Sequence, residues 1–135
     1  MSSNPTQAGV IPYRFKNGEP RILLITSRTS KRWIIPKGNI EDDLGVPGTA
    51  AMEAFEEAGI RGWMPDESVG TYSHVSSPGI DIIEVFPLFV EEIHDDFPES
   101  HVRRRRWVTR SEAQEAVLEV GLKELLGSVR FTTPR

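Results

Sequence analysis

The chain has 135 residues, of which 38% are hydrophobic and 27% charged, as is typical of one soluble globular domain. It contains no cysteine, which excludes disulfides and thiolate metal sites, so any metal must be held by oxygen or imidazole ligands. The net charge of −4 argues against general nucleic-acid binding, because neutralising a phosphate backbone requires many cations. A small phosphorylated ligand stays open, since it responds to local charge.

The N-terminus carries no basic segment followed by an apolar run, so it does not match a signal peptide. No apolar stretch reaches the length needed to cross a membrane. We therefore expect a cytoplasmic protein without membrane attachment, built as a single domain over residues 1–135 with flexible tails at 1–6 and 128–135. The sequence leaves the oligomeric state open.

The first predicted elements are two strands, over residues 8–15 and 21–26. Between them lies Asn17-Gly18, a pair that readily adopts the positive φ angles of a tight hairpin turn. Pro12 interrupts the first strand and lacks an N–H, which predicts an edge strand or a bulge there. The domain is expected to open with this β-hairpin.

A loop with three cations follows, and residues 33–35 then predict a short buried strand. Pro36 should end that strand, and Gly38 would let the backbone approach a ligand or an ion closely. We take Arg28 and Arg32 of the loop and Lys37 after the strand as candidate substrate-binding residues. The alternative is that this basic loop is only solvated.

The next predicted element is a helix over residues 49–58, with Thr49 as its N-cap and Gly59 as a left-handed C-cap. The helical rotation of about 100° per residue gathers three carboxylates on one face. These carboxylates belong to Glu53, Glu56 and Glu57.

Ala51, Phe55 and Ala58 are predicted on the opposite, buried face of the same helix. Like charges one turn apart destabilise a helix, and a hard divalent cation such as Mg²⁺ would remove that repulsion. The residues alone leave two interpretations open, a metal site or a solvated acidic surface.

After the helix, Trp63 is expected to anchor the packing, and strands are predicted over residues 69–75 and 80–90. Residues 76–79 should form the turn between these strands. Pro87 again indicates a bulge or an exposed edge. An acidic loop follows at residues 91–100, from which one carboxylate could approach a metal.

A last strand is predicted over residues 101–108, where Arg103 and Arg105 would share one face and Arg104 and Arg106 the other. Either a phosphate site or ion pairs with the acidic loop would satisfy them. The C-terminal helix is expected to start at Ser111, with a capping box over the four residues from that serine.

The segment from Gly38 to Ile60 resembles the Nudix box, whose pattern is Gly, five residues, Glu, seven residues, Arg-Glu, an apolar residue, any residue, Glu-Glu, any residue, Gly and an apolar residue. The positions in register are Gly38, Glu53, Ala54, Glu56, Glu57, Gly59 and Ile60. Two positions depart from the pattern, because Leu44 replaces its first Glu and Met52 its Arg. The family uses these two charged residues to support the site, so we predict an apolar contact between Leu44 and Met52 here.

The resemblance implies an α/β fold, an α-β-α sandwich with a mixed sheet, an acidic loop-helix-loop and a C-terminal helix. It implies an enzyme that hydrolyses a diphosphate bond with Mg²⁺, or Mn²⁺, as cofactor. Glu53 and Glu57 are the implied metal ligands, and Glu56 is a third ligand or the group that accepts the proton of the attacking water. The carbonyl of Gly38 is an implied additional ligand.

The segments flanking the box are similar to the diphosphoinositol polyphosphate and diadenosine polyphosphate phosphohydrolase branch of the family. This similarity implies a highly anionic small-molecule substrate. The same box would serve a hydrolase of nucleotide sugars or nucleoside triphosphates. A further alternative is a non-catalytic module that only binds a phosphorylated ligand.

Overall fold

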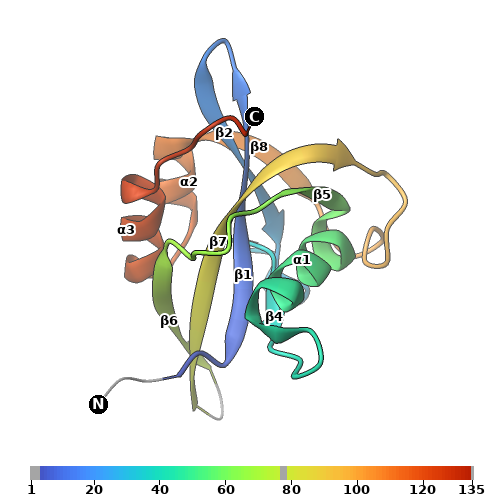
Figure 1. Ribbon diagram of the computed structural model, residues 1–135, viewed down its shortest axis with the longest axis vertical. Coiled ribbons are helices and arrows are strands. Elements are labelled where there is room, and N and C mark those ends of the chain that lie inside the picture. The colour runs from blue at the N-terminus through green and yellow to red at the C-terminus, as the bar shows by residue number, and fades with distance from the viewer. Residues whose placement is uncertain (1–3, 77–78, 135) are drawn as a thin grey trace.

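The computed structural model describes residues 4–76 and 79–134. Within these residues, eight strands form one mixed sheet, and three helices cover it (Figure 1). The strands are β1 (Gln7–Lys16), β2 (Glu19–Thr26), β3 (Trp33–Ile34), β4 (Lys37–Asn39), β5 (Ile60–Trp63), β6 (Gly70–Ser76), β7 (Gly79–Ile93) and β8 (Arg105–Thr109). The helices are α1 (Gly45–Ala58), α2 (Arg110–Ala116) and α3 (Val120–Ser128).

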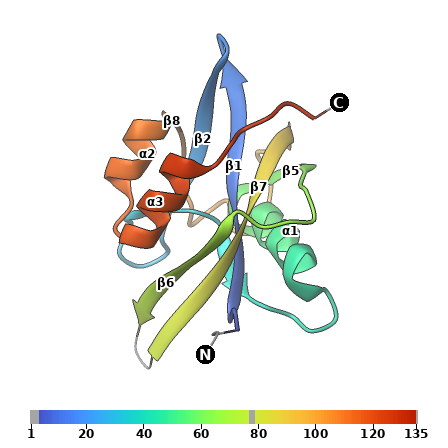
Figure 2. The same ribbon diagram turned by 60° about the vertical axis from the view of Figure 1, so that its left-hand side comes forward.

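Helix α1 lies on one face of the sheet, and α2 and α3 lie on the other (Figure 2). Successive side chains of a strand point to opposite faces, so each strand contributes to both cores. In β1, Val10 packs in the cluster under α1, whereas Ile11 packs in the cluster under α2 and α3. Ile34 and Ile35 divide in the same way. The predicted α-β-α sandwich is therefore confirmed.

The opening hairpin forms as predicted, with Asn17 at φ 54° and Gly18 at φ 79°. The predicted strands over 69–75 and 80–90 correspond to β6 and β7, which pair antiparallel. Ser77 and Pro78, in the predicted turn, lie outside the described residues. Trp63 corrects an expectation: its side chain is 44% exposed, so it does not anchor the core.

The two strand prolines occupy places where a strand changes partners. Strand β1 is central, parallel to β7 on one side and paired on the other with β4 through residues 7–9 and with β2 through residues 13–16. Pro12 lies between those two ladders, so the prediction that it marks an edge strand is wrong. Pro87 is buried and lies between the ladders that β7 forms with β6 and with β5. Both prolines belong to the β1–β7 ladder, and on the other side of its strand each stands in the gap between two ladders.

Helix α1 starts one turn before the predicted residue 49. Its N-cap is Leu44, which makes no side-chain capping hydrogen bond. Thr49 is buried inside the helix, where its Oγ1 accepts a hydrogen bond from the backbone N–H of Glu41. Thr49 thus fixes the loop before the helix and does not cap it. Gly59 closes the helix in the left-handed conformation, at φ 68°, as predicted.

The C-terminal region also differs from its prediction. Strand β8 spans only Arg105–Thr109, and the capping box is formed by Thr109 and Glu112, two residues before the predicted one. The predicted single helix is divided into α2 and α3, because Val117 and Glu119 are extended. None of these helices, nor α1, is long and apolar enough to cross a membrane within the described residues.

The segment after α3, predicted as a flexible tail, packs against β1. Val129 is buried, and the ring of Phe131 lies 4.6 Å from that of Tyr13. The Tyr13 hydroxyl also donates a hydrogen bond of 2.6 Å to the carbonyl of Thr132. Aromatic burial therefore orders this segment although it forms no helix or strand. Residues 1–3 and 135 of the predicted tails lie outside the described residues.

Candidate active site

Two glutamates of α1 form the centre of the candidate site. Glu53 and Glu57 are one turn apart, and only 9% and 7% of their surfaces are exposed. Glu57 Oε1 accepts a hydrogen bond of 3.1 Å from the backbone N–H of Lys37 in β4. The Glu53 carboxylate lies directly against Gly38, where a Cβ atom would overlap it. The short strand β4 therefore brings the first glycine of the box onto its glutamates.

The sequence predicts the carboxylates on the face of α1 opposite its buried face. The structure differs, because Glu53 and Glu57 are themselves buried. The buried positions are Ala50, Ala54 and Ala58 together with Glu53 and Glu57, so the two glutamates border the core. Ala51 is exposed, and Phe55 is only partly buried. The small alanine side chains let α1 approach the sheet closely, and this proximity carries the neighbouring carboxylates into the interior.

Burial raises the pKa of both carboxyl groups. Desolvation raises the pKa of Glu57 to about 8, although the charge of Arg103 and the N–H of Lys37 oppose this shift. Desolvation also raises the pKa of Glu53, and the charges of Glu56 and Glu99 add to that effect. Both groups are therefore harder to ionise than a free glutamate, and a cation bound beside them would favour their charged forms.

Arg103 is the cation that reaches this cluster from the sheet side. Its side chain is 5% exposed, and its Nη2 lies 3.3 Å from Glu57 Oε2 and 2.8 Å from Glu99 Oε1. The neighbouring Arg105 donates to the carbonyls of Ala58 and His94. Of the two predicted alternatives, a phosphate site or ion pairs with the acidic loop, the structure therefore supports the second for Arg103. Arg105 is held by hydrogen bonds to main-chain carbonyls.

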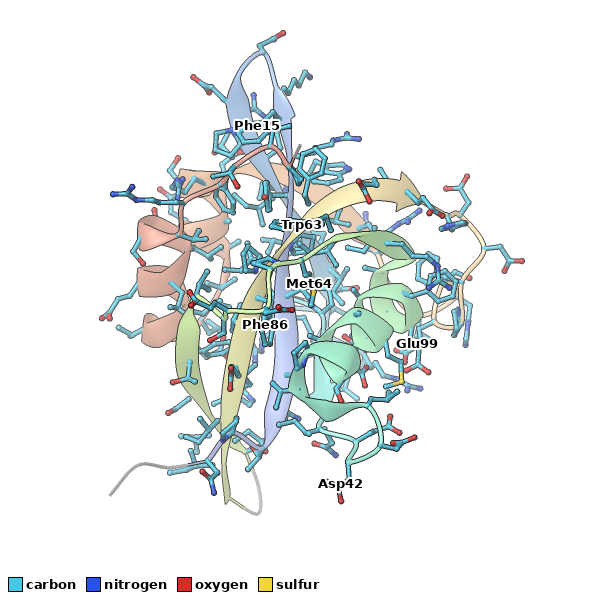
Figure 3. The ribbon with its side chains drawn as sticks, viewed as in Figure 1. Phe15, Asp42, Trp63, Met64, Phe86 and Glu99 are labelled. Atoms are coloured by element: carbon cyan, nitrogen blue, oxygen red, sulfur yellow. The ribbon has the colours of Figure 1, made fainter. Side chains whose placement is uncertain are left out.

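Glu99 is the acidic-loop residue that approaches the site, a choice that the sequence left open. Its backbone N–H donates to the carbonyl of Glu56, and its side chain pairs with Arg103. Figure 3 shows Glu99 beside α1. The only sequence signal was the spacing of four residues between Glu99 and Arg103, which a turn brings together. Glu56 itself is partly exposed at the edge of the cluster.

The predicted substrate-binding cations are dispersed. Arg28 is exposed in the loop between β2 and β3. Arg32 pairs with Glu119 at 2.8 Å, on the other side of the sheet from α1. Lys37 donates from Nζ to the side chain of Gln7. The structure does not bring the three together around the glutamates, and their contact with a substrate stays a prediction.

Leu44 and Met52, for which an apolar contact is predicted, both lie on α1 and its N-cap. Leu44 is the N-cap of α1, and Met52 lies eight residues further along, or about 12 Å along the helix axis. Leu44 is also 41% exposed. The replacement of the family's supporting ion pair by this apolar pair therefore stays a prediction.

The donor set suits a hard cation that keeps some of its own water. Within residues 4–76 and 79–134, no three carboxylate or imidazole side chains are arranged to hold a metal ion alone. Magnesium commonly binds through one or two carboxylates and completes its octahedron with water and phosphate oxygens. Glu53 and Glu57, buried side by side beside Gly38, fit that mode, and a cation would favour their ionised forms.

A separate cavity of about 260 Å³ lies on the α2 side of the sheet. Its lining includes Trp33, Arg106, Glu112 and Glu115. None of the glutamates of α1 contributes to it. The cavity is therefore distinct from the carboxylate cluster, although Trp33 belongs to the strand that leads into β4.

The sequence and the fold are similar to those of known proteins. Residues 4–127 match the model of the NUDIX domain. The chain is 36% identical over 124 residues to Nudix hydrolase 21, chloroplastic, of Arabidopsis thaliana, and the match covers 87% of this chain and 62% of that protein. It is 29% identical to the diphosphoinositol polyphosphate phosphohydrolase 3-alpha of Homo sapiens, over 75% of this chain and 62% of the relative. The chain thus spans about three fifths of the length of these two relatives.

A solved structure of the C. elegans Ap4A hydrolase has the same fold. Its TM-score is 0.75 at 21% sequence identity, and the superposition covers 90% of this chain and 92% of the other. The match to the domain model agrees with the structure, in which α1 covers one face of the sheet and Gly38 lies against Glu53. The chain belongs to the Nudix hydrolase family.

Proposed function

We propose that this protein is a pyrophosphohydrolase that uses Mg²⁺, or Mn²⁺, to hydrolyse a diphosphate bond in a small phosphorylated molecule. The observation that carries the proposal is the buried pair of Glu53 and Glu57 beside Gly38. Two adjacent desolvated carboxylates, of which only Glu57 is in contact with Arg103, are suited to a divalent metal. Bound there, the metal would supply charge neutralisation at the diphosphate and a water with a lowered pKa.

Each residue of the cluster has a proposed role in metal binding or proton transfer. Glu53 and Glu57 would hold the metal, with the carbonyl of Gly38 as an additional ligand. Glu56 borders the cluster and is partly exposed, a position from which it would accept the proton of the attacking water. Glu99 adds a fourth carboxylate at the same edge.

The substrate class proposed is a diadenosine or diphosphoinositol polyphosphate. Two observations support it: the human relative is named a diphosphoinositol polyphosphate phosphohydrolase, and the structural neighbour is an Ap4A hydrolase. Exposed cations on the β2–β3 loop, namely Arg28 and Lys31, would suit such anions. The cytoplasmic location stays a prediction, since relatives carry chloroplastic and mitochondrial names.

A substrate panel with and without Mg²⁺ tests the proposal. It should contain diadenosine polyphosphates, diphosphoinositol polyphosphates, nucleotide sugars and nucleoside triphosphates, with products identified by mass. We expect Mg²⁺-dependent cleavage of a diphosphate bond, fastest in the first two classes. Turnover of nucleotide sugars alone would overturn the substrate class and leave the reaction intact.

Substitution of Glu53 separates an enzyme from a module that only binds. Glu53→Gln keeps the side-chain shape but removes a ligand charge, so hydrolysis should fall by more than the roughly 10–100-fold typical of residues behind the ligands. Glu124→Gln, on the exposed surface of α3, is the matched control and should keep full activity. Tight binding of a panel compound without turnover in the unsubstituted protein would favour the binding module.

A further inference from the structure

We propose that Arg103 is a positioning residue, whose guanidinium holds Glu57 and the loop residue Glu99 in place around the metal site. The inference rests on the proposed function and adds to it a residue outside the box. The family pattern has an arginine at position 52, where this chain has Met52. In this chain the arginine that contacts a box glutamate comes instead from the segment before β8.

The guanidinium of Arg103 is fixed independently of Glu57. Its Nη1 donates a hydrogen bond of 2.9 Å to the carbonyl of Thr26, at the end of β2. Its Nε donates at 2.9 Å to Glu99, and Nη2 lies 2.8 Å from the same oxygen. The backbone N–H of Arg103 also bonds the carbonyl of Glu99. A planar fork held by a sheet carbonyl and a carboxylate has little freedom to turn.

This fixed fork determines how Glu57 presents its carboxylate. One Glu57 oxygen accepts from the N–H of Lys37 at 3.1 Å, and the other lies 3.3 Å from Arg103 Nη2. The two oxygens are therefore held by different partners, so the carboxylate plane is set from both ends. Such support behind a ligand commonly governs metal affinity, because it removes the cost of ordering the ligand on binding.

Arg103 also connects the acidic loop to the helix. Glu99 contacts α1 through its N–H to the carbonyl of Glu56 and contacts the sheet through Arg103. One buried side chain thus joins the end of β2, the acidic loop and α1. Within the described residues, Arg103 is the only lysine or arginine side chain in an ion pair with Glu57.

Manganese titration of the full chain by calorimetry tests this role. Arg103→Met should weaken Mn²⁺ binding about tenfold or more. Arg103→Lys keeps the charge but cannot bind Thr26, Glu99 and Glu57 together, so its affinity should lie between those of the wild type and the Met variant. The matched control is Arg104→Met, because Arg104 is adjacent and exposed, and it should bind Mn²⁺ as the wild type does.

The outcomes are distinct. Wild-type affinity in both Arg103 variants, tighter binding in Arg103→Met, or an equal loss in Arg104→Met would each overturn the positioning role. Wild-type affinity in Arg103→Lys alone would show that charge suffices and would overturn it as well. If Arg103→Met does not fold, Arg103→Lys decides. A wild-type chain that binds no Mn²⁺ would overturn the proposed function itself, and this assignment with it.

Discussion

At the scale of single residues, the contact between Gly38 and Glu53 shows why a glycine opens the box. A Cβ on residue 38 would overlap the Glu53 carboxylate and lie 2.8 Å from its Oε1 atom. The obstacle is the end of a flexible side chain, so the backbone could tolerate alanine if Glu53 moved. The glycine therefore matters for the placement of the Glu53 carboxylate, and much less for the fold.

Gly38→Ala should accordingly separate function from stability. We expect hydrolysis to fall by about 10–100-fold, the range for displaced metal-site partners, with a denaturation midpoint near that of the wild type. Activity assays and urea unfolding measure the two effects. Gly79→Ala is the control, because a Cβ there meets no atom within 4 Å. A large loss of stability with unchanged metal affinity would contradict this account of Gly38.

At the scale of elements, Glu119 joins three parts of the chain on the side of the sheet away from α1. As the N-cap of α3, it accepts from Arg32 of the β2–β3 loop at 2.8 Å and contacts His74 of β6 at 2.7 Å. Burial opposes ionisation of Glu119, but hydrogen bonds from Arg32 and His74 outweigh it and lower the pKa of the carboxyl. Arg32, a candidate for substrate binding, thus has a structural partner.

A lowered pKa in the folded state means that ionised Glu119 stabilises the fold. That contribution is complete above the ordinary carboxyl pKa of 4.5 and is lost as the pH falls through the lowered folded value. Glu119→Gln should therefore cost about 1–3 kcal/mol at pH 7, and the difference from the wild type should disappear in acid. Urea midpoints measured from pH 7 down to pH 3 check this, with Glu124→Gln as a control that should show no such trend.

Some of these elements and contacts could be predicted from the sequence, and others could not. Local signals sufficed where chemistry is local: the Asn17-Gly18 turn, the left-handed Gly59 and the spacing of the box glutamates. The start of α1 could not be predicted, because Thr49, the expected cap, instead accepts a hydrogen bond from the loop at Glu41. The division of the last helix could not be predicted either, because no local signal marked the extended residues Val117 and Glu119. The partners of Arg32 and Arg103 lie far along the chain or on other elements, and a pattern of charges does not reveal such pairs.

At the scale of the whole molecule, the sheet separates two chemically different halves. On the α1 side lie the buried carboxylates with Arg103, and on the other side lie α2, α3 and the junction at Glu119. The carboxylate cluster lowers the stability of the metal-free fold, because two desolvated acids must share one region. A cation that neutralises them should therefore stabilise the folded chain as a whole.

Thermal unfolding with Mg²⁺ measures this coupling. At about 100 times the dissociation constant, a ligand specific to the folded state adds about 2.7 kcal/mol, which should raise the melting temperature by about 5–10 °C. The increase should shrink in Glu53→Gln and persist in Glu119→Gln. A melting temperature that ignores Mg²⁺ in the wild type would contradict the metal site.

The placement of Pro87 also limits the hydrogen bonds that this part of the sheet can offer to another strand. Strand β7 has an open stretch on the side between its ladders with β5 and β6, and an unpaired strand edge can template the addition of another chain. The main-chain nitrogen that faces this opening belongs to proline and cannot donate a hydrogen bond. At Pro87 the gap between the two ladders therefore offers no main-chain donor to an approaching strand.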